Sequence, residues 1–126
     1  MKQVLLIDDN PVQLSVREAV LRRVGLQVLV ATTGESALAT LRGLRHNIGI
    51  VVTDHIMPGC DGPELVRRVR TLDAKLPIVV LSGLAEASAE YEGMGVIFRC
   101  KPLPPVELIE LVRAKLKEPE QSQGAA

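Results

Sequence analysis

Short apolar segments alternate with longer segments of helical periodicity along the chain. Five apolar segments predict strands, at residues 4–7, 27–31, 48–53, 77–81 and 96–100. Several of them are apolar at consecutive positions, as in Ile78-Val79-Val80-Leu81, and do not alternate with polar residues. Continuous apolarity is typical of strands covered on both faces, so the pattern predicts a parallel sheet between two layers of helices.

Segments with helical periodicity lie between and after the strands, at residues 11–24, 33–44, 63–72, 85–92 and 105–117. The buried face of the first helix is expected to consist of apolar residues at helical spacing, namely Val12, Val16, Ala19, Val20 and Val24. Thr33, with Ser36 nearby, can cap the second helix. Gly93 and Gly95 cut the fourth helix short.

The elements form a strand followed by a helix, repeated five times. Because crossovers between parallel strands are right-handed, this order predicts an α/β fold, a doubly wound three-layer sandwich of the flavodoxin-like type. Of the two plausible strand orders we expect 2-1-3-4-5, in which ligands bind outside the carboxyl ends of strands 1 and 3.

Length and composition limit the number of domains that the chain can form. Its 126 residues fit one domain, expected at residues 1–118, and the polar and small residues 119–126 predict a flexible C-terminal tail. Hydrophobic residues make up 47% and charged residues 24%, which argues against wholesale disorder. Met1 directly before the first strand favours a natural start.

The residue types exclude several classes of partner. Fifteen basic residues balance fifteen acidic ones, and Tyr91 and Phe98 are the only aromatic residues, so no direct nucleic-acid partner is expected. No apolar run approaches the roughly 20 residues that a membrane span requires, and the N-terminal run is too short for a signal peptide. Cys60 and Cys100 form neither a disulfide framework nor a metal-ligand spacing, so we expect reduced thiols and a cytoplasmic location.

Polar residues follow four of the predicted strands. Asp8 and Asp9 follow the first strand and Asp54 follows the third, so the switch point of the sheet gathers three carboxylates. Because like charges repel at close range, such a cluster normally holds a cation, and an all-oxygen site suits Mg²⁺. Ser82 and Lys101 follow strands 4 and 5 at the same edge, where a hydroxyl and an ammonium suit a dianionic phosphoryl group.

Four segments, each at the end of a predicted strand, together resemble the receiver domain of two-component response regulators, of the kind found in chemotaxis regulators. They are Val4-Leu5-Leu6-Ile7-Asp8-Asp9-Asn10, Thr53-Asp54-His55-Ile56-Met57-Pro58-Gly59-Cys60-Asp61-Gly62, Leu81-Ser82-Gly83 and Lys101-Pro102-Leu103. The resemblance covers residues 2–117.

The resemblance implies roles for the acidic residues. Asp54 would be the phosphoacceptor, taking a phosphoryl group from a histidine kinase or a histidine phosphotransfer protein. Mg²⁺, for which Mn²⁺ can substitute, would be bound directly by Asp9, Asp54 and the backbone carbonyl of Ile56, and through water by Asp8. Lys101 would pair first with Asp54 and afterwards with the phosphoryl group.

The resemblance also implies a switch. Ser82 would close on the phosphoryl group, and the backbone amides of Ile56 and Gly83 would donate hydrogen bonds to it. This movement would be coupled to the ring of Phe98 on the last strand, which would turn towards a buried rotamer.

The last strand and its approach depart from the common family pattern. Only 19 positions separate Ser82 from Lys101, fewer than is usual, and this shortens a helix on the face that many receivers use to form a homodimer. Phe98 replaces the commoner tyrosine and offers no hydroxyl to a partner. The Lys101–Pro102 peptide bond is expected to be cis, as in the family.

Two apolar residues lie beside the acceptor segments. Ile56 and Leu84 stand two positions after Asp54 and Ser82, and apolar side chains there cannot orient an attacking water. We therefore expect the acyl phosphate to decay slowly compared with receivers that carry polar residues at these positions.

The implied function is a phosphorylation-activated switch, enzymatic only in self-catalysed phosphotransfer and autodephosphorylation. The kinase is expected to contact helix 11–24, with Val12, Leu14 and Ser15 as candidate residues. An output protein or domain and a second copy of the chain are further candidate partners. The chain could stand alone, act in a phosphorelay, or be severed from a hybrid kinase or a larger regulator.

Two other classes of protein share features of the sequence. A Mg²⁺-dependent phosphatase of the haloacid-dehalogenase type also uses an aspartate nucleophile, but it carries a second acid two residues later, where this chain has Ile56. A flavin or nucleotide binder on the same fold would need a glycine-rich phosphate loop after the first strand, which this sequence lacks.

Overall fold

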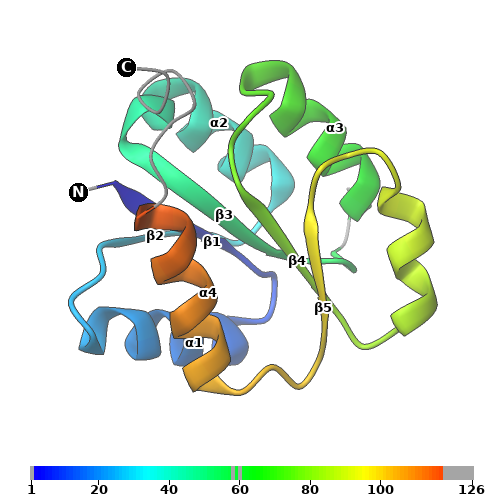
Figure 1. Ribbon diagram of the computed structural model, residues 1–126. Coiled ribbons are helices and arrows are strands. Elements are labelled where there is room, and N and C mark those ends of the chain that lie inside the picture. Colours follow the sequence, from blue (N-terminus) through cyan, green and yellow to red (C-terminus); the bar gives the residue numbers. More distant parts are fainter. Residues whose placement is uncertain (1, 58, 60, 118–126) are drawn as a thin grey trace.

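A five-stranded parallel sheet forms the centre of the protein, in the order β2-β1-β3-β4-β5 (Figure 1). The computed structural model describes residues 2–57, 59 and 61–117. The strands are β1 (Gln3–Ile7), β2 (Val28–Ala31), β3 (Ile48–Asp54), β4 (Ile78–Ser82) and β5 (Ile97–Cys100). The predicted fold class and strand order are confirmed, and each predicted strand agrees within one residue at either end. The tail predicted at 119–126 lies outside the described residues.

Helices cover both faces of the sheet (Figure 1). They are α1 (Pro11–Arg23), α2 (Gly34–Leu44), α3 (Gly62–Leu72) and α4 (Pro105–Lys117), with two 3₁₀ helices, η1 (Arg45–Asn47) and η2 (Ala85–Tyr91). Helices α1 and α4 pack on one face, whereas α2 and α3 pack on the other. No helix in the described part of the chain is both long and apolar enough to span a bilayer.

The strands bury side chains on both faces, which explains their continuous apolarity. In β1, Leu5 and Ile7 belong to the core under α2 and α3, whereas Val4 and Leu6 belong to the core under α1 and α4. All four side chains are at most 1% exposed. A polar residue at any of these positions would meet apolar side chains whichever face it pointed to.

The predicted buried face of α1 is wrong in its first half, whereas Val20 and Val24 are half-buried and Val24 packs against the core. Val12 and Val16 are 70% and 56% exposed, and the buried residues of the helix are Leu14 and Leu21. The helix carries two apolar stripes, one of valines and one of leucines, and the sequence pattern alone does not say which one faces the sheet. Leu14, expected to contact a kinase, instead packs in the core.

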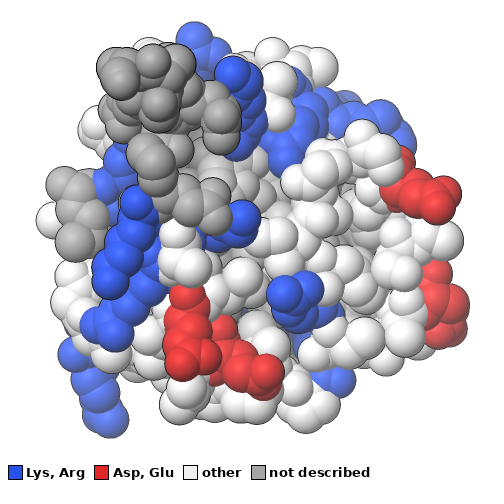
Figure 2. All heavy atoms as spheres, viewed as in Figure 1, with Lys and Arg blue, Asp and Glu red and all other residues white. Residues whose placement is uncertain are grey.

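The segment after β4 is a 3₁₀ helix, where the sequence predicted a short α-helix. The segment η2 ends at Tyr91, and Gly93 and Gly95 follow with φ of +78° and +70°. Such φ values suit glycine and terminate a helix, so no longer helix can form before β5. Figure 2 shows acidic side chains at the edge of the molecule where η2 lies.

The cap predicted for α2 is present. The side-chain oxygen of Thr33 accepts a hydrogen bond of 3.0 Å from the backbone N–H of Ser36, and the Ser36 hydroxyl oxygen accepts one from the backbone of Thr33. This reciprocal capping box fixes where the helix begins.

Candidate functional site

The register of the sheet brings the carboxyl ends of its central strands level with one another. Ile7 pairs with Thr53, Asp54 with Leu81, and Ser82 with Cys100. The residues that follow these positions therefore meet at one edge of the sheet, on the two sides of the switch point between β1 and β3.

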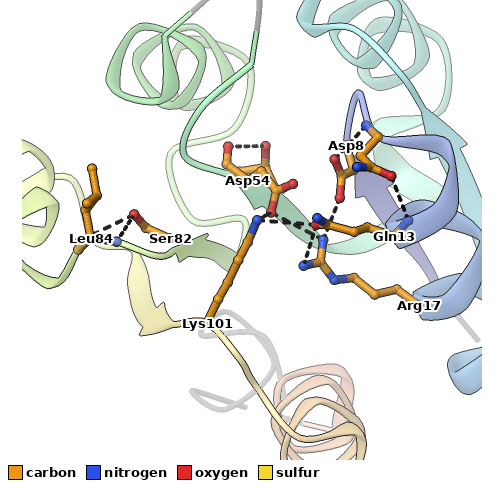
Figure 3. A network of polar contacts seen from close by, with 9 residues as sticks. Asp8, Gln13, Arg17, Asp54, Ser82, Leu84 and Lys101 are labelled. Atoms are coloured by element: carbon orange, nitrogen blue, oxygen red, sulfur yellow. Dashed lines mark hydrogen bonds and ion pairs between the residues drawn. The ribbon is translucent and has the colours of Figure 1, made fainter.

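Asp54 and Lys101 form the centre of this edge. Asp54 ends β3 and is 4% exposed, and its Oδ1 lies 3.0 Å from Nζ of Lys101 (Figure 3). The lysine follows β5, where its backbone N–H donates a hydrogen bond to the carbonyl of Ser82. Its peptide bond with Pro102 is cis. The contact therefore leaves the buried aspartate carboxylate beside a cation.

A second cation enters the site from α1. Nη1 of Arg17 lies 2.8 Å from Oδ2 of Asp8 and 3.3 Å from Oδ1 of Asp54 (Figure 3). One guanidinium nitrogen thus bridges two buried carboxylates. The sequence pattern did not single out Arg17, because it predicted a different face of α1 towards the sheet.

Gln13 connects the two cations. Its Oε1 accepts a hydrogen bond of 3.3 Å from Nζ of Lys101 and one of 3.4 Å from Nη2 of Arg17 (Figure 3). Gln13 and Arg17 stand four residues apart on α1, so they share one face of the helix. The signal that could have revealed them is this polar pair in the first turns of the helix that follows the acidic segment.

Asp8 lies deeper than any other acid of the site and is 1% exposed. Its Oδ1 accepts a hydrogen bond of 2.9 Å from the backbone N–H of Asn10, whose own side chain caps α1. Burial, together with a side-chain hydrogen bond to Asp54 and the charge of that residue, raises the pKa of Asp8 from 3.8 to about 6. These effects outweigh the Asn10 amide and the charge of Arg17, which lower the pKa.

Asp9 does not join this cluster. Its side chain is exposed and makes no hydrogen bond or ion pair with the described residues. Across residues 2–57, 59 and 61–117, no three His, Cys, Asp or Glu side chains lie close enough together to hold a metal ion. Asp8 and Asp54 offer buried oxygen donors that already share a cation, so their chemistry fits a hard divalent ion.

Ser82 is buried beside the site, but its hydroxyl faces its own loop. Its Oγ accepts a hydrogen bond of 3.0 Å from the backbone N–H of Leu84 and donates one of 3.3 Å to the carbonyl of the same residue (Figure 3). The backbone amides of Ile56 and Gly83 have no hydrogen-bond partner within the described part of the chain. Two backbone donors at this edge are therefore available to a ligand.

Phe98 is half-buried on β5, in contact with another ring. Its centroid lies 5.9 Å from that of Tyr91, which is 3% exposed at the end of η2. Both rings belong to the core under α2 and α3. The aromatic residue singled out in the sequence thus packs against Tyr91, the only tyrosine of the chain.

A groove of about 360 Å³ adjoins the site between α1 and α4. Arg17 and Lys101 reach its wall from the acidic side. The rest of the wall is mostly apolar and includes Val12, Val16, Val20, Leu103, Pro105 and Leu108. The exposed valines of α1 therefore form one side of an apolar depression next to Asp54.

Comparisons with known proteins agree with the fold described above. Residues 4–113 match the family model of the response regulator receiver domain. The chain is 30% identical over 129 residues to the response regulator GtcR of Aneurinibacillus migulanus, covering 95% of this chain and 52% of GtcR. It is 40% identical over 89 residues to Histidine kinase 2 of Arabidopsis thaliana, covering 71% of this chain and 7% of the kinase.

A solved structure shares the fold over nearly the whole chain. The crystal structure of a CheY-like response regulator receiver domain protein from Methanospirillum hungatei JF-1 superposes with a TM-score of 0.86 at 26% identity. The match covers 97% of this chain and 98% of that one. By contrast, this chain spans about half the length of GtcR and a small part of Histidine kinase 2.

Proposed function

This chain belongs to the response regulator receiver domain family, and we propose that it is a phosphorylation-activated switch that accepts a phosphoryl group on Asp54. The donor is a histidine kinase or a histidine phosphotransfer protein of a two-component system. The observation that carries the proposal is the position of Asp54, a carboxylate at the end of β3 with Nζ of Lys101 at 3.0 Å.

The proposed reaction is an in-line transfer between two side chains. An oxygen of the Asp54 carboxylate attacks the phosphorus of the donor phosphohistidine, and the new O–P bond forms as the P–N bond breaks. The imidazole leaves with the electron pair of that bond and takes up a proton from solvent. The product is an aspartyl phosphate, whose phosphoryl oxygens lie within reach of Lys101.

Residues of this chain would stabilise the charge on the transferring group. The ammonium of Lys101 and the backbone amides of Ile56 and Gly83, which have no hydrogen-bond partner among the described residues, supply donors at the edge of the sheet. The hydroxyl of Ser82 would join them after leaving its contacts with Leu84. Mg²⁺ or Mn²⁺, held by Asp8, Asp9, Asp54 and the Ile56 carbonyl, would supply further positive charge when bound.

The switch would be transmitted through strand β5. Inward movement of Ser82 would open space towards Phe98, whose ring is half-buried and contacts Tyr91. A change in this ring pair would alter the surface around η2 and β5. That surface is where we place the contact with an output protein, an output domain or a second copy of the chain.

The partner that delivers the phosphoryl group would dock on the groove beside α1. Val12 and Val16 expose apolar side chains there, and the groove opens next to Lys101. An apolar helix face of a kinase or phosphotransfer protein fits such a surface, and it would bring a phosphohistidine over Asp54. We expect this exchange to take place in the cytoplasm.

Intact-protein mass spectrometry tests the acceptor. The wild type incubated with Mg²⁺ and acetyl phosphate, or with phosphoramidate, should gain the mass of one phosphoryl group. Asp54→Asn should gain none, whereas Asp73→Asn, which changes an acid at the end of α3, should gain it like the wild type. A gain in Asp54→Asn would assign the acceptor to another residue, and no gain with either donor would overturn the proposed reaction.

A further inference from the structure

The guanidinium of Arg17 places a positive charge at the site without any bound metal ion. Its Nη1 contacts both buried acids, at 2.8 Å from Asp8 and 3.3 Å from Asp54. With Lys101 also on Asp54, two positive side chains face two buried carboxylates. The formal charge of this buried group is therefore already balanced before any metal ion enters.

Nη1 of Arg17 lies between the two carboxylates that would bind a divalent ion. A metal ion that bridges Asp8 and Asp54 from the side of α1 would use the oxygen atoms that Nη1 contacts, Oδ2 of Asp8 and Oδ1 of Asp54. A guanidinium and a divalent cation at this separation repel one another, and the repulsion is strong because both acids are at most 4% exposed. The two cations cannot occupy the space between these carboxylates together.

Arg17 also has room to leave. Its side chain is 17% exposed and lines the apolar groove between α1 and α4. Outside the acid pair, its side-chain contact is a hydrogen bond of 3.4 Å to Gln13, which is itself exposed and also bonds Lys101. A rotation of the long side chain towards the groove would free both carboxylates without a movement of the backbone.

We propose that Arg17 is a resident counter-ion of the acid pair, which holds Asp8 and Asp54 together without metal and must be displaced when a divalent cation binds. Arg17 thereby lowers the affinity of the site for Mg²⁺. This inference rests on the proposed function only for the identity of the metal. Arg17 is a positioning residue, and the reacting atom remains the Asp54 carboxylate.

The test compares Mg²⁺ affinity in three proteins by isothermal titration calorimetry, in chelator-treated buffer at low salt. They are the wild type, Arg17→Gln, and Arg23→Gln as a matched control. Arg23 lies on the same helix, is exposed, and makes no side-chain hydrogen bond or ion pair with the described residues. Removal of the charge-assisted contacts in Arg17→Gln should tighten Mg²⁺ binding by about tenfold. Arg23→Gln should bind like the wild type.

A second measurement uses the unaltered chain, in case Arg17→Gln is poorly folded without metal. Side-chain NMR signals of Arg17 should be protected from hydrogen exchange in the metal-free protein and should lose that protection as Mg²⁺ saturates. Mn²⁺ binding followed by electron paramagnetic resonance should rank the three proteins as Mg²⁺ does.

Three results would overturn the inference. They are equal or weaker Mg²⁺ binding by Arg17→Gln, continued protection of Arg17 in the metal-saturated wild type, and no metal binding by any of the three proteins. These measurements use no phosphoryl donor, so their outcome does not depend on whether Asp54 accepts a phosphoryl group. Tighter binding by Arg17→Gln in a chain that fails to gain a phosphoryl group would support the inference and reject the proposed function.

Discussion

The hydroxyl of Tyr91 lies 2.5 Å from Nδ1 of His55, the residue directly after Asp54. The two rings meet edge to face, with centroids 5.5 Å apart at 71°. Burial raises the pKa of Tyr91, so its hydroxyl stays protonated and can donate to the imidazole. Because Tyr91 also packs on Phe98, this contact links the acceptor loop to the aromatic ring of β5.

Removal of the Tyr91 hydroxyl should weaken that link without leaving a cavity in the core. Tyr91→Phe keeps the ring and loses a hydrogen bond between two largely buried groups, so the free energy of unfolding should fall by about 1 kcal/mol. Urea denaturation measures the change. In a protein that also carries His55→Leu, Tyr91→Phe should lower the free energy of unfolding much less. An equal decrease with and without His55→Leu would show that the Tyr91–His55 hydrogen bond does not stabilise the protein.

Gly62, the first residue of α3, is packed against the same pair. A Cβ at this position would collide with the Tyr91 hydroxyl and lie 2.9 Å from the backbone carbonyl of His55. Gly62→Ala should therefore lower the free energy of unfolding by about 2 kcal/mol, although alanine favours helix.

Gly43 in α2 supplies the matched comparison, since an added Cβ there meets no atom within 4 Å. Gly43→Ala should raise the free energy of unfolding by up to about 1 kcal/mol, because alanine favours helix and has open space. Thermal or urea unfolding of the two variants should thus show opposite signs. A shared sign would mean that helix propensity, and not the contact with Tyr91, decides the effect at Gly62.

The sequence predicted the sheet well because burial on both faces leaves little freedom in a strand. Continuous apolar runs such as Ile78-Val79-Val80-Leu81 are typical of a strand between two helical layers, and the strand order then placed Asp54 and Lys101 at one edge. The helix α1 was less constrained. Its valines and leucines lie on different faces, so the pattern did not reveal which stripe packs on the sheet.

The error in α1 carried over into the site. With the valine stripe placed inward, the pattern did not direct Arg17 or Gln13 to the site, although Arg17 contacts both acids and Gln13 contacts Arg17 and Lys101. Asp9 shows a second limit of prediction from the sequence, in the direction of a side chain. It follows β1 as predicted, but adjacent residues point different ways, so Asp8 is buried and Asp9 is exposed. Distances between side chains depend on such details, which strand order alone does not supply.

Asp8 should make the stability of the metal-free protein depend on pH. Its folded pKa, about 6, lies above the ordinary 3.8, so between these values the native state binds a proton that the unfolded chain has released. The stabilisation is complete below the ordinary pKa and is lost as the pH rises through the folded pKa. Relative to Asp8→Asn, the wild type should lose up to about 3 kcal/mol between about pH 4 and pH 7.

Urea unfolding of both proteins in EDTA across that range measures the effect. Asp8→Asn keeps the shape of the side chain and one acceptor oxygen for the backbone N–H of Asn10, but it replaces the oxygen that contacts Arg17, so it removes the titration at the cost of one acceptor that does not depend on pH. A difference between the two proteins that stays constant with pH would contradict the prediction.

Loss of the Lys101 ammonium should slow phosphoryl uptake more than it affects folding. The side chain contacts Asp54 at 3.0 Å but is 31% exposed, so Lys101→Met removes a donor from the transferring group at little cost in buried contacts. We expect the rate of phosphorylation by phosphoramidate to fall roughly a hundredfold. Lys75→Met, in the exposed segment before β4, should react like the wild type. Equal rates of phosphorylation in both variants would show that Lys101 takes no part in the reaction.

The lifetime of the aspartyl phosphate should be governed by two apolar side chains that flank Asp54. Ile56 is 68% exposed and Leu84 is 46% exposed, so both stand at the solvent side of the site rather than in the core. Neither can accept a hydrogen bond from a water positioned to attack the phosphorus, and slow hydrolysis follows. Ile56→Asn with Leu84→Glu adds polar groups at these places and should speed the loss of radiolabel from the phosphorylated protein.

The matched control for that pair is a change of the same kind on Leu44, an exposed apolar residue at the end of α2, before the start of β3. Asp54 stands at the other end of β3, so Leu44→Asn adds no group beside it, and its dephosphorylation rate should equal that of the wild type. Because the substitutions at Ile56 and Leu84 replace exposed side chains, the free energy of unfolding should change by less than about 0.5 kcal/mol. Unchanged decay in the folded double variant would show that water access is controlled elsewhere in the site.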